Sequence, residues 1–142
     1  YSGYSGQIHR TFSIGEGPTP QWQKMHDAAM EAFEILSKVI KDGATTTEAE
    51  EAAEIIHERG YSTYDDLVHG VNQYPPIFQT KSRKRHDAKE MRFRENMVIV
   101  IQPNLMAYDE KMGLQFGETL VVKKNGCESL NAYPREWVTC KG

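Results

Sequence analysis

A run of five consecutive apolar residues at positions 97–101 limits what this chain can fold into more than any other feature. No polar residue interrupts the run, so a strand formed by it would carry apolar side chains on both faces. Such a strand is stable only inside a sheet that is covered on both sides. The chain has 142 residues, of which 39% are hydrophobic, and this is enough for one core. We therefore expect a single domain with a buried strand near its centre.

A helix is predicted over residues 20–42. Pro20 suits its first turn, and Gly43 suits the position just past its end. Apolar residues recur between these limits at helical spacing and form one stripe: Trp22, Met25, Ala29, Ala32, Phe33, Leu36, Val39 and Ile40. The stripe indicates a helix that packs one face against the core.

A second helix is predicted over residues 47–59. Thr47 followed by Glu50 fits a capping box, and Gly60 fits the terminating position. Its narrow inner face would consist of small and aliphatic residues: Ala49, Ala52, Ala53 and Ile56.

Further strands are expected at both ends of the chain. Residues 7–14 are expected to form a strand whose side chains point alternately to its two faces, with Ile8, Arg10, Phe12 and Ile14 on one of them. Residues 117–123 form another, and the Asn125–Gly126 turn leads to a short return strand near Ser129. Residues 61–80 contain Gly70, Pro75 and Pro76, and their pattern predicts irregular structure.

The composition argues against several classes of function. A net charge of −3 and a pI near 6.0 do not favour a nucleic-acid-binding domain. No apolar run is long enough to span a membrane, and two isolated cysteines form no disulfide framework, so we expect a reducing, cytoplasmic compartment. The chain begins with Tyr1 rather than Met, as a fragment or a processed protein would. One stretch is basic, but interleaved acidic residues favour a solvated loop or short helix: Lys81, Arg83, Lys84, Arg85, Lys89, Arg92 and Arg94.

Four segments, in this order, resemble the family of creatinase, prolidase, aminopeptidase P and methionine aminopeptidase. Residues 7–12 (QIHRTF) resemble the family's D-x-T-R-T-F strand, and residues 69–72 (HGVN) resemble its H-G-x-G loop. Residues 95–103 (ENMVIVIQP) resemble its x-G-M-V-x-T-I-E-P strand, and residues 113–122 (GLQFGETLVV) resemble the strand of its last glutamate. The resemblance implies an α+β pita-bread fold and covers nearly the whole chain.

Residues 1–142 would then be one partial domain, the C-terminal portion of that fold: a strand, two helices and an antiparallel curved sheet. The upstream half of the fold would be absent from this sequence. We therefore expect the chain to pair with the missing half or to form a homodimer, because an open sheet edge is a liability.

The resemblance also implies a pair of divalent metals (manganese, cobalt, zinc or iron) held by two aspartates, one histidine and two glutamates. The visible ligand positions match Gln7, His69, Gln102 and Gly117. Three of these four lack the carboxylate that the position requires. An amide is neutral and cannot bridge two cations, so we expect no dinuclear metal and no cofactor.

Gln7, His69 and Gln102 would still line one cavity if the fold is kept. A neutral, amide-lined cavity binds a peptide or a polar small molecule by hydrogen bonds. Tyr74 is a further candidate for ligand binding, and packing against Pro75 is its alternative.

Three functions stay open at this point. The first is a catalytically degenerate family member that is retained for ligand binding or assembly. The second is an active hydrolase of the Xaa-Pro peptidase type with a relocated site, in which His69 and Glu118 would be catalytic and His9 would assist. Glu118 would need a bulge beside Gly117 to turn inward, because neighbours on a strand point to opposite faces. The third is a protein-interaction module that uses the basic stretch.

Overall fold

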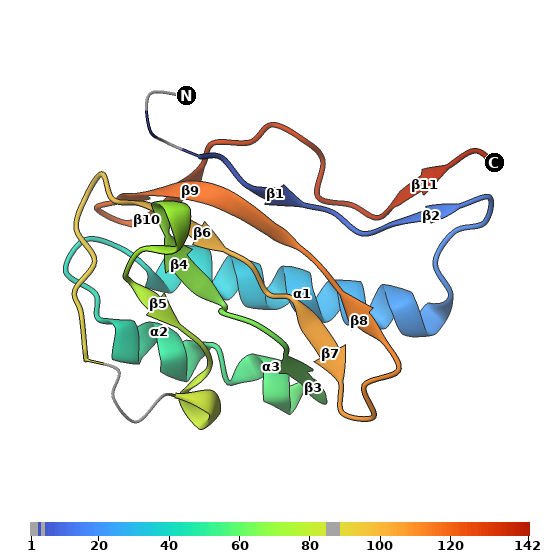
Figure 1. The fold of residues 1–142 in the computed structure, drawn as a ribbon, viewed down its shortest axis with the longest axis horizontal. Coiled ribbons are helices and arrows are strands. Elements are labelled where there is room, and N and C mark those ends of the chain that lie inside the picture. Colours follow the sequence, from blue (N-terminus) through green and yellow to red (C-terminus); the bar gives the residue numbers. More distant parts are fainter. Residues whose placement is uncertain (1–2, 4, 85–88) are drawn as a thin grey trace.

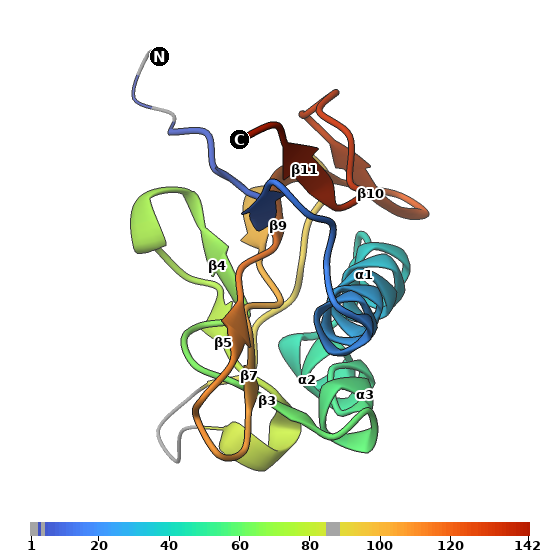
Figure 2. The same cartoon turned by 90° about the vertical axis from the view of Figure 1, so that its right-hand side faces the viewer.

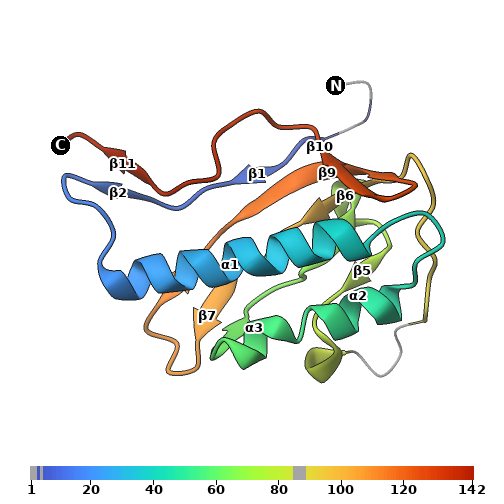
Figure 3. The ribbon, with the colours of Figure 1, turned by 180° about the vertical axis from the view of Figure 1, so that it is seen from behind.

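Three helices lie together on one face of a curved sheet in the computed structural model, which describes residues 3, 5–84 and 89–142 (Figures 1 and 2). The helices are α1 (Pro20–Val39), α2 (Thr46–Ala52) and α3 (Ile55–Glu58). Seen from behind, α1 crosses the sheet over most of its length, and α2 and α3 follow one another beside it (Figure 3). None of the described helices is long and apolar enough to cross a membrane.

The main sheet is antiparallel and has six strands. Its order is β1-β9-β6-β4-β5, and β10 pairs with β9 beside this path. The strands are β1 (Ile8–His9), β4 (Val68–Gly70), β5 (Ile77–Phe78), β6 (Val98–Ile101), β9 (Gly117–Lys123) and β10 (Gly126–Ser129).

Two smaller sheets complete the fold. One joins β3 (Tyr61–Thr63), β7 (Leu105–Ala107) and β8 (Gly113–Leu114) in that order. The other is a parallel pair of β2 (Phe12–Ile14) and β11 (Val138–Cys140), which places a segment from the start of the chain beside one from its end (Figure 1). Short 3-10 turns lie at Val71–Gln73 and Lys81–Arg83.

The core forms where the apolar run of residues 97–101 packs against the apolar stripe of α1. Ile99 and Ile101 of β6 are fully buried, and so are Phe33 and Leu36 of α1. Val100 faces the opposite side of the sheet and is only 4% exposed. The run therefore forms a central strand with buried residues on both faces, as the sequence predicts.

The second helical region differs from the prediction. The capping box is formed by Thr45 and Glu48, not by Thr47 and Glu50, and helix α2 starts at Thr46. Glu50 lies on the buried side, 2% exposed, where it pairs with Lys84. The helix is also interrupted after Ala52, and Gly60 ends the second piece with a φ of 85°.

The N-terminal strand also differs from the prediction. It divides into β1 and β2, and the face predicted to be apolar is largely exposed, with Ile8 42%, Phe12 57% and Ile14 71% accessible. Arg10 lies on the same face but is buried against Glu118. Residues 61–80, predicted to be irregular, contain strands β3, β4 and β5.

Candidate functional site

Polar residues gather on the face of the main sheet that points away from the helices. Strand pairing places His9 opposite Gly117, Thr119 opposite Val100, and Val100 opposite His69. Residues directly opposite one another in an antiparallel pair share a face. If the same register is continued along the strands, the residues on this face form two neighbouring rows. One row contains Gln7, Thr119, Val100 and His69, and the other contains His9, Gly117 and Gln102. The fold therefore places all four expected ligand positions on one surface.

The two glutamines are bonded to each other. Gln7 Nε2 donates to Gln102 Oε1, and Gln102 Nε2 donates to the carbonyl oxygen of Asp66 at 2.8 Å. The same Gln102 nitrogen lies 3.3 Å from Asp65 Oδ2, and Asn104 Nδ2 donates to both Asp65 oxygens at 2.9 and 3.1 Å. A chain of amide hydrogen bonds thus runs from a carboxylate in the loop before β4 to the N-terminal segment.

His69 is buried on the polar face of the sheet. Its Nδ1 is 2.8 Å from the carbonyl oxygen of Gly70, and the residue is 2% exposed. Its Nε2 is buried and has no hydrogen-bond partner among the described residues. Asn72 in the loop after β4 bonds to Ser5, which brings the N-terminal segment over this end of β4.

Gly117 is in close contact with Gln102. A Cβ at position 117 would lie 2.8 Å from Gln102 Cβ, 3.0 Å from Gln102 Cα and 3.1 Å from the carbonyl oxygen of Ile101. Real Cβ atoms do not approach other atoms this closely. Position 117 therefore accepts only glycine while strand β6 stays where it is.

Glu118 does not join the site. It pairs with Ile101 across the strands, and so it shares the face of the helices rather than the face of His69. Its carboxylate is fully buried and bonds to Arg10, Arg135 and Ser129. Burial alone would raise the pKa of Glu118, but the hydrogen bonds from Arg135, Ser129 and Arg10 outweigh it and hold the pKa below its usual value. The inward turn that the relocated hydrolase would need is absent here, because β9 continues through Gly117 and Glu118 in regular register.

The remaining candidates lie at the margins of the site. Tyr74 is 67% exposed, so it does not pack into the core before Pro75. His9 lies in the second row, and its Nδ1 is buried without a hydrogen-bond partner in the part of the chain that the structure describes. His9 is close enough to Asp65 to lower the pKa of that carboxyl, although burial, the largest effect, raises it overall.

Asp65 and Asn104 are site residues that the sequence pattern did not reveal. Asp65 follows β3 in the segment predicted to be irregular, and Asn104 follows Gln102 by two positions. Neither occupies an expected ligand position. The available signal was the acidic pair Asp65–Asp66, which stands four and three residues before His69 and which sequence alone does not place near Gln102.

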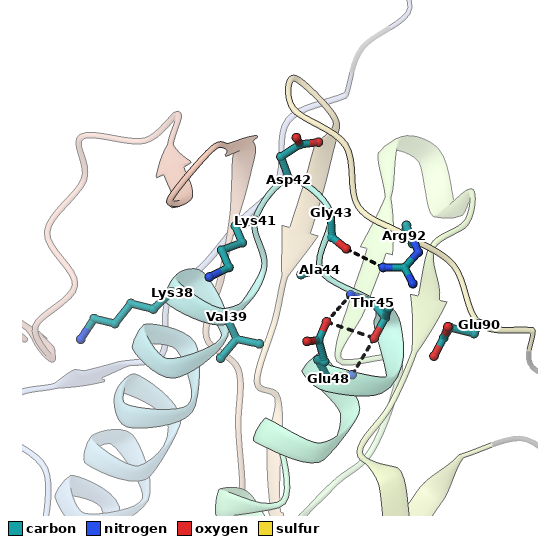
Figure 4. Close-up of a pocket in the computed structure, with 10 residues that line it drawn as sticks. All are labelled: Lys38, Val39, Lys41, Asp42, Gly43, Ala44, Thr45, Glu48, Glu90 and Arg92. Atoms are coloured by element: carbon teal, nitrogen blue, oxygen red, sulfur yellow. Dashed lines mark hydrogen bonds between the residues drawn. The ribbon is translucent and has the colours of Figure 1, made fainter.

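The basic stretch is largely occupied by internal contacts. Arg83 donates to Ser62 and to the carbonyl oxygen of Thr63, and Lys84 pairs with buried Glu50. Arg92 donates to the carbonyl oxygen of Gly43 at the rim of an open pocket of about 730 Å3 between α1 and α2 (Figure 4). Charges of both signs line this pocket, including Lys38, Lys41, Glu48 and Glu90. Arg85 lies outside the described residues.

A family model described as metallopeptidase family M24 matches residues 1–124. An uncharacterised peptidase of Methanocaldococcus jannaschii, MJ0806, is 29% identical over 136 residues. That alignment covers 92% of this chain but 37% of the relative, so the chain spans just over a third of its length.

Solved structures agree with this match. The X-Pro aminopeptidase from Thermotoga maritima MSB8 superposes with a TM-score of 0.79 and 30% identity, over 98% of this chain and 39% of that one. The prolidase from Pyrococcus horikoshii OT3 superposes with a TM-score of 0.75 and 28% identity, over 96% of this chain and 38% of that one.

Proposed function

This chain belongs to metallopeptidase family M24 and has part of the pita-bread fold, and we propose that it binds a peptide or a polar small molecule without a dinuclear metal. The observation that carries the proposal is the hydrogen bond between Gln7 and Gln102. In the family pattern, both positions hold carboxylates whose charge keeps two cations close together. Here they hold neutral amides that satisfy each other.

The residues present do not fit the metal pair that the family implies. Two cations need bridging negative charge, and neither amide supplies it. A carboxylate could not return at position 117, because its Cβ would overlap Gln102. Among the described residues, no group of three or more His, Cys, Asp or Glu side chains is arranged to hold a metal ion. His69 alone keeps the side chain of a family ligand.

The polar face offers hydrogen bonding in place of metal chemistry. Gln102 and His69 are buried and Gln7 is half-buried, and Val100 and Thr119 lie between them on the same face. The buried Nε2 of His69 has no partner among the described residues, and a ligand that donates to it would remove a cost of about 1–3 kcal/mol. A degenerate M24 domain that is retained for binding accounts for both the kept fold and the replaced ligands.

A pairing partner is part of the same proposal. The β1 strand is at the edge of the main sheet, and Ile8 on it is 42% exposed. The chain also spans 37% of the length of its curated relative. We infer that this edge is covered by the remaining part of the fold, with a second copy of the chain as the alternative.

Metal analysis of the purified protein tests the proposal. After incubation with Mn²⁺ or Co²⁺ and removal of free metal, we expect well below one tightly bound metal per chain. Two tightly bound metals per chain would overturn the proposal. Because loss of metal alone does not show ligand binding, the dipeptide Ala-Pro is titrated in parallel by NMR.

Gln7→Ala and Gln102→Ala are expected to weaken Ala-Pro binding about tenfold each, which corresponds to the ~1.4 kcal/mol of a lost hydrogen bond. Gln23→Ala is the matched control, because the exposed Gln23 side chain lies on α1 and bonds to Asp27 on the same helix. Equal effects of all three substitutions would contradict a ligand site on the polar face.

A further inference from the structure

His26 is a titratable residue of α1 that lies on the helix side of the main sheet, away from the polar face. It is only 5% exposed. Its ring packs edge to face with the core residue Phe116, at 6.0 Å between ring centroids and 86° between the ring planes. A similar contact, at 5.7 Å and 70°, joins it to Trp137. His26 therefore connects the core to a residue just before β11.

Trp137 is the contact of residues 136–140 with α1. These residues, called the C-terminal segment below, include β11 and lie beside the start of α1 (Figure 3). Trp137 packs against Trp22 of α1, at 6.3 Å between ring centroids, and its Nε1 donates to Ser13 Oγ of β2 at 3.1 Å. Because β11 pairs with β2 from Val138 onward, a movement of Trp137 would loosen this parallel pair.

Charged groups approach the His26 ring from three parts of the chain. They are Asp27 on α1, Glu136 on the C-terminal segment with Arg135 just before it, and Arg10 between β1 and β2. Asp27 Oδ1 is 4.0 Å from His26 Nδ1, but the Asp27 side chain is 68% exposed and already accepts from Gln23. Residues 113–117, which include Phe116, carry no charged side chain. None of these groups is a buried carboxylate in hydrogen-bond contact with His26.

The balance of these effects disfavours the charged ring. Burial is the largest effect and lowers the pKa of His26, and the charge of Arg10 acts in the same direction. A hydrogen bond to the backbone of Arg135 and the charges of the two neighbouring carboxylates raise the pKa, but they do not offset the burial. Protonation of His26 is therefore easier when Trp137 has moved away and water reaches the ring.

We propose that His26 is a proton-sensitive contact, which holds the C-terminal segment on α1 at neutral pH and lets it open in mild acid. A neutral imidazole packs well between two aromatic rings, whereas a buried imidazolium lacks the solvent or ion partner that it needs. The opening stays local, because Arg135 donates two hydrogen bonds to Glu118, which remains ionised at these pH values. The proposal does not depend on what binds at the polar face.

The direction of the pH effect follows from proton linkage. In the open form, His26 is solvated and titrates near its ordinary pKa of 6.5, whereas in the closed form its pKa lies below that value. The open form therefore binds protons first, and its population rises as the pH falls below about 6.5. The rise ends below the pKa of the closed form, and its full extent equals the ratio of the two acid dissociation constants.

Hydrogen exchange between about pH 7.5 and pH 5 tests the proposal in the wild-type protein. After correction for intrinsic rates, the amides of β2 and β11 should exchange faster than those of β6 at every pH, because the segment opens without global unfolding. The protection factors of β2 and β11 should also fall with the pH, by the factor that an NMR titration of the His26 ring predicts.

Two variants assign the pH dependence to one ring. His26→Gln removes the titrating group and keeps a neutral polar side chain, so the protection of β2 and β11 should lose its dependence on pH in this range. His57→Gln is the matched control and should keep the wild-type dependence, because His57 lies on α3, where it bonds to Tyr108 and Thr80.

Three results would overturn the proposal. The first is a His26 ring that titrates at or above its ordinary pKa of 6.5. The second is equal protection of β11 and β6, which would mean that the segment opens only when the whole protein unfolds. The third is the same pH dependence of protection in wild type and His26→Gln. The first two results come from the wild-type protein, so they decide the question even if a variant does not fold.

Discussion

At the residue scale, the contact between Gly117 and Gln102 limits which residues position 117 can accept. We expect Gly117→Ala to destabilise the protein by about 1–3 kcal/mol, because the new Cβ overlaps strand β6. Urea unfolding monitored by fluorescence measures the change in the free energy of unfolding. Gly113→Ala is the matched control, since its Cβ would meet its nearest neighbour, the carbonyl oxygen of Leu105, at an ordinary 3.6 Å.

A double variant isolates this contact. In the background of Gln102→Gly, which removes the Cβ at position 102, the cost of Gly117→Ala should fall by at least a third. The remaining cost comes from the Cα of residue 102 and the carbonyl oxygen of Ile101. An unchanged cost in that background would mean that the contact with Gln102 does not restrict position 117.

Glu118 predicts a pH dependence of stability. Its pKa is held below the usual value in the folded protein, so its pairing stabilises the fold at pH values above the pKa of an unfolded glutamate. This contribution is lost as the pH falls below about 4.5 and through the lower folded pKa. The free energy of unfolding should therefore fall with decreasing pH in this range, and less steeply in Glu118→Gln. If the free energy of unfolding changed with pH at the same slope in wild type and variant, Glu118 would not contribute to the pH dependence of stability.

Part of the site could be predicted from the family resemblance. The four ordered motifs point to Gln7, His69, Gln102 and Gly117, and strand pairing places these four residues on one face of the sheet. Asp65 could not be predicted, because its contact with Gln102 depends on how the loop before β4 folds back. That path is determined by tertiary contacts and not by a local pattern.

At the scale of single elements, the start of α2 provides a direct comparison between prediction and structure. Thr45 and Glu48 form the capping box, whereas the sequence pattern favoured Thr47 and Glu50. Thr45→Ala should cost about 1 kcal/mol through loss of the cap, and Thr47→Ala should stay within about 0.5 kcal/mol. Thermal unfolding of the two variants distinguishes them, and a larger effect at Thr47 would contradict the observed helix start.

Elements with a strong local pattern were predicted well, and short paired elements were not. The apolar stripe of α1 and the uninterrupted run of β6 each specify their own burial. The strands β3, β4 and β5 have only two or three residues each, and their pairing partners lie elsewhere in the chain. Too few residues contribute to such strands for an alternating pattern to emerge.

At the scale of the whole molecule, the exposed apolar residues of the N-terminal strands predict association. Ile8 lies on β1, an edge strand of the main sheet, and Phe12 and Ile14 lie on β2, which pairs with β11. We expect this chain, prepared by itself, to self-associate at micromolar concentration. Ile8→Lys together with Phe12→Lys should raise the dissociation constant of this association about tenfold. Sedimentation velocity measures the shift. The exposed pair Tyr64→Lys and Tyr108→Lys is the control, and an equal shift there would indicate non-specific association.

The pairing of β2 with β11 also determines when this part of the fold can form during synthesis. Gln7 bonds to Thr119, which is 112 residues farther along, and β2 finds its parallel partner only after Cys140 has been made. Closing a loop of this length has a high entropic cost, so these pairings form late. Until then, the nascent chain carries β1 and β2 as unpaired apolar strands. Protection by a chaperone is therefore expected to matter most for this segment while the ribosome is still translating the C-terminal strands.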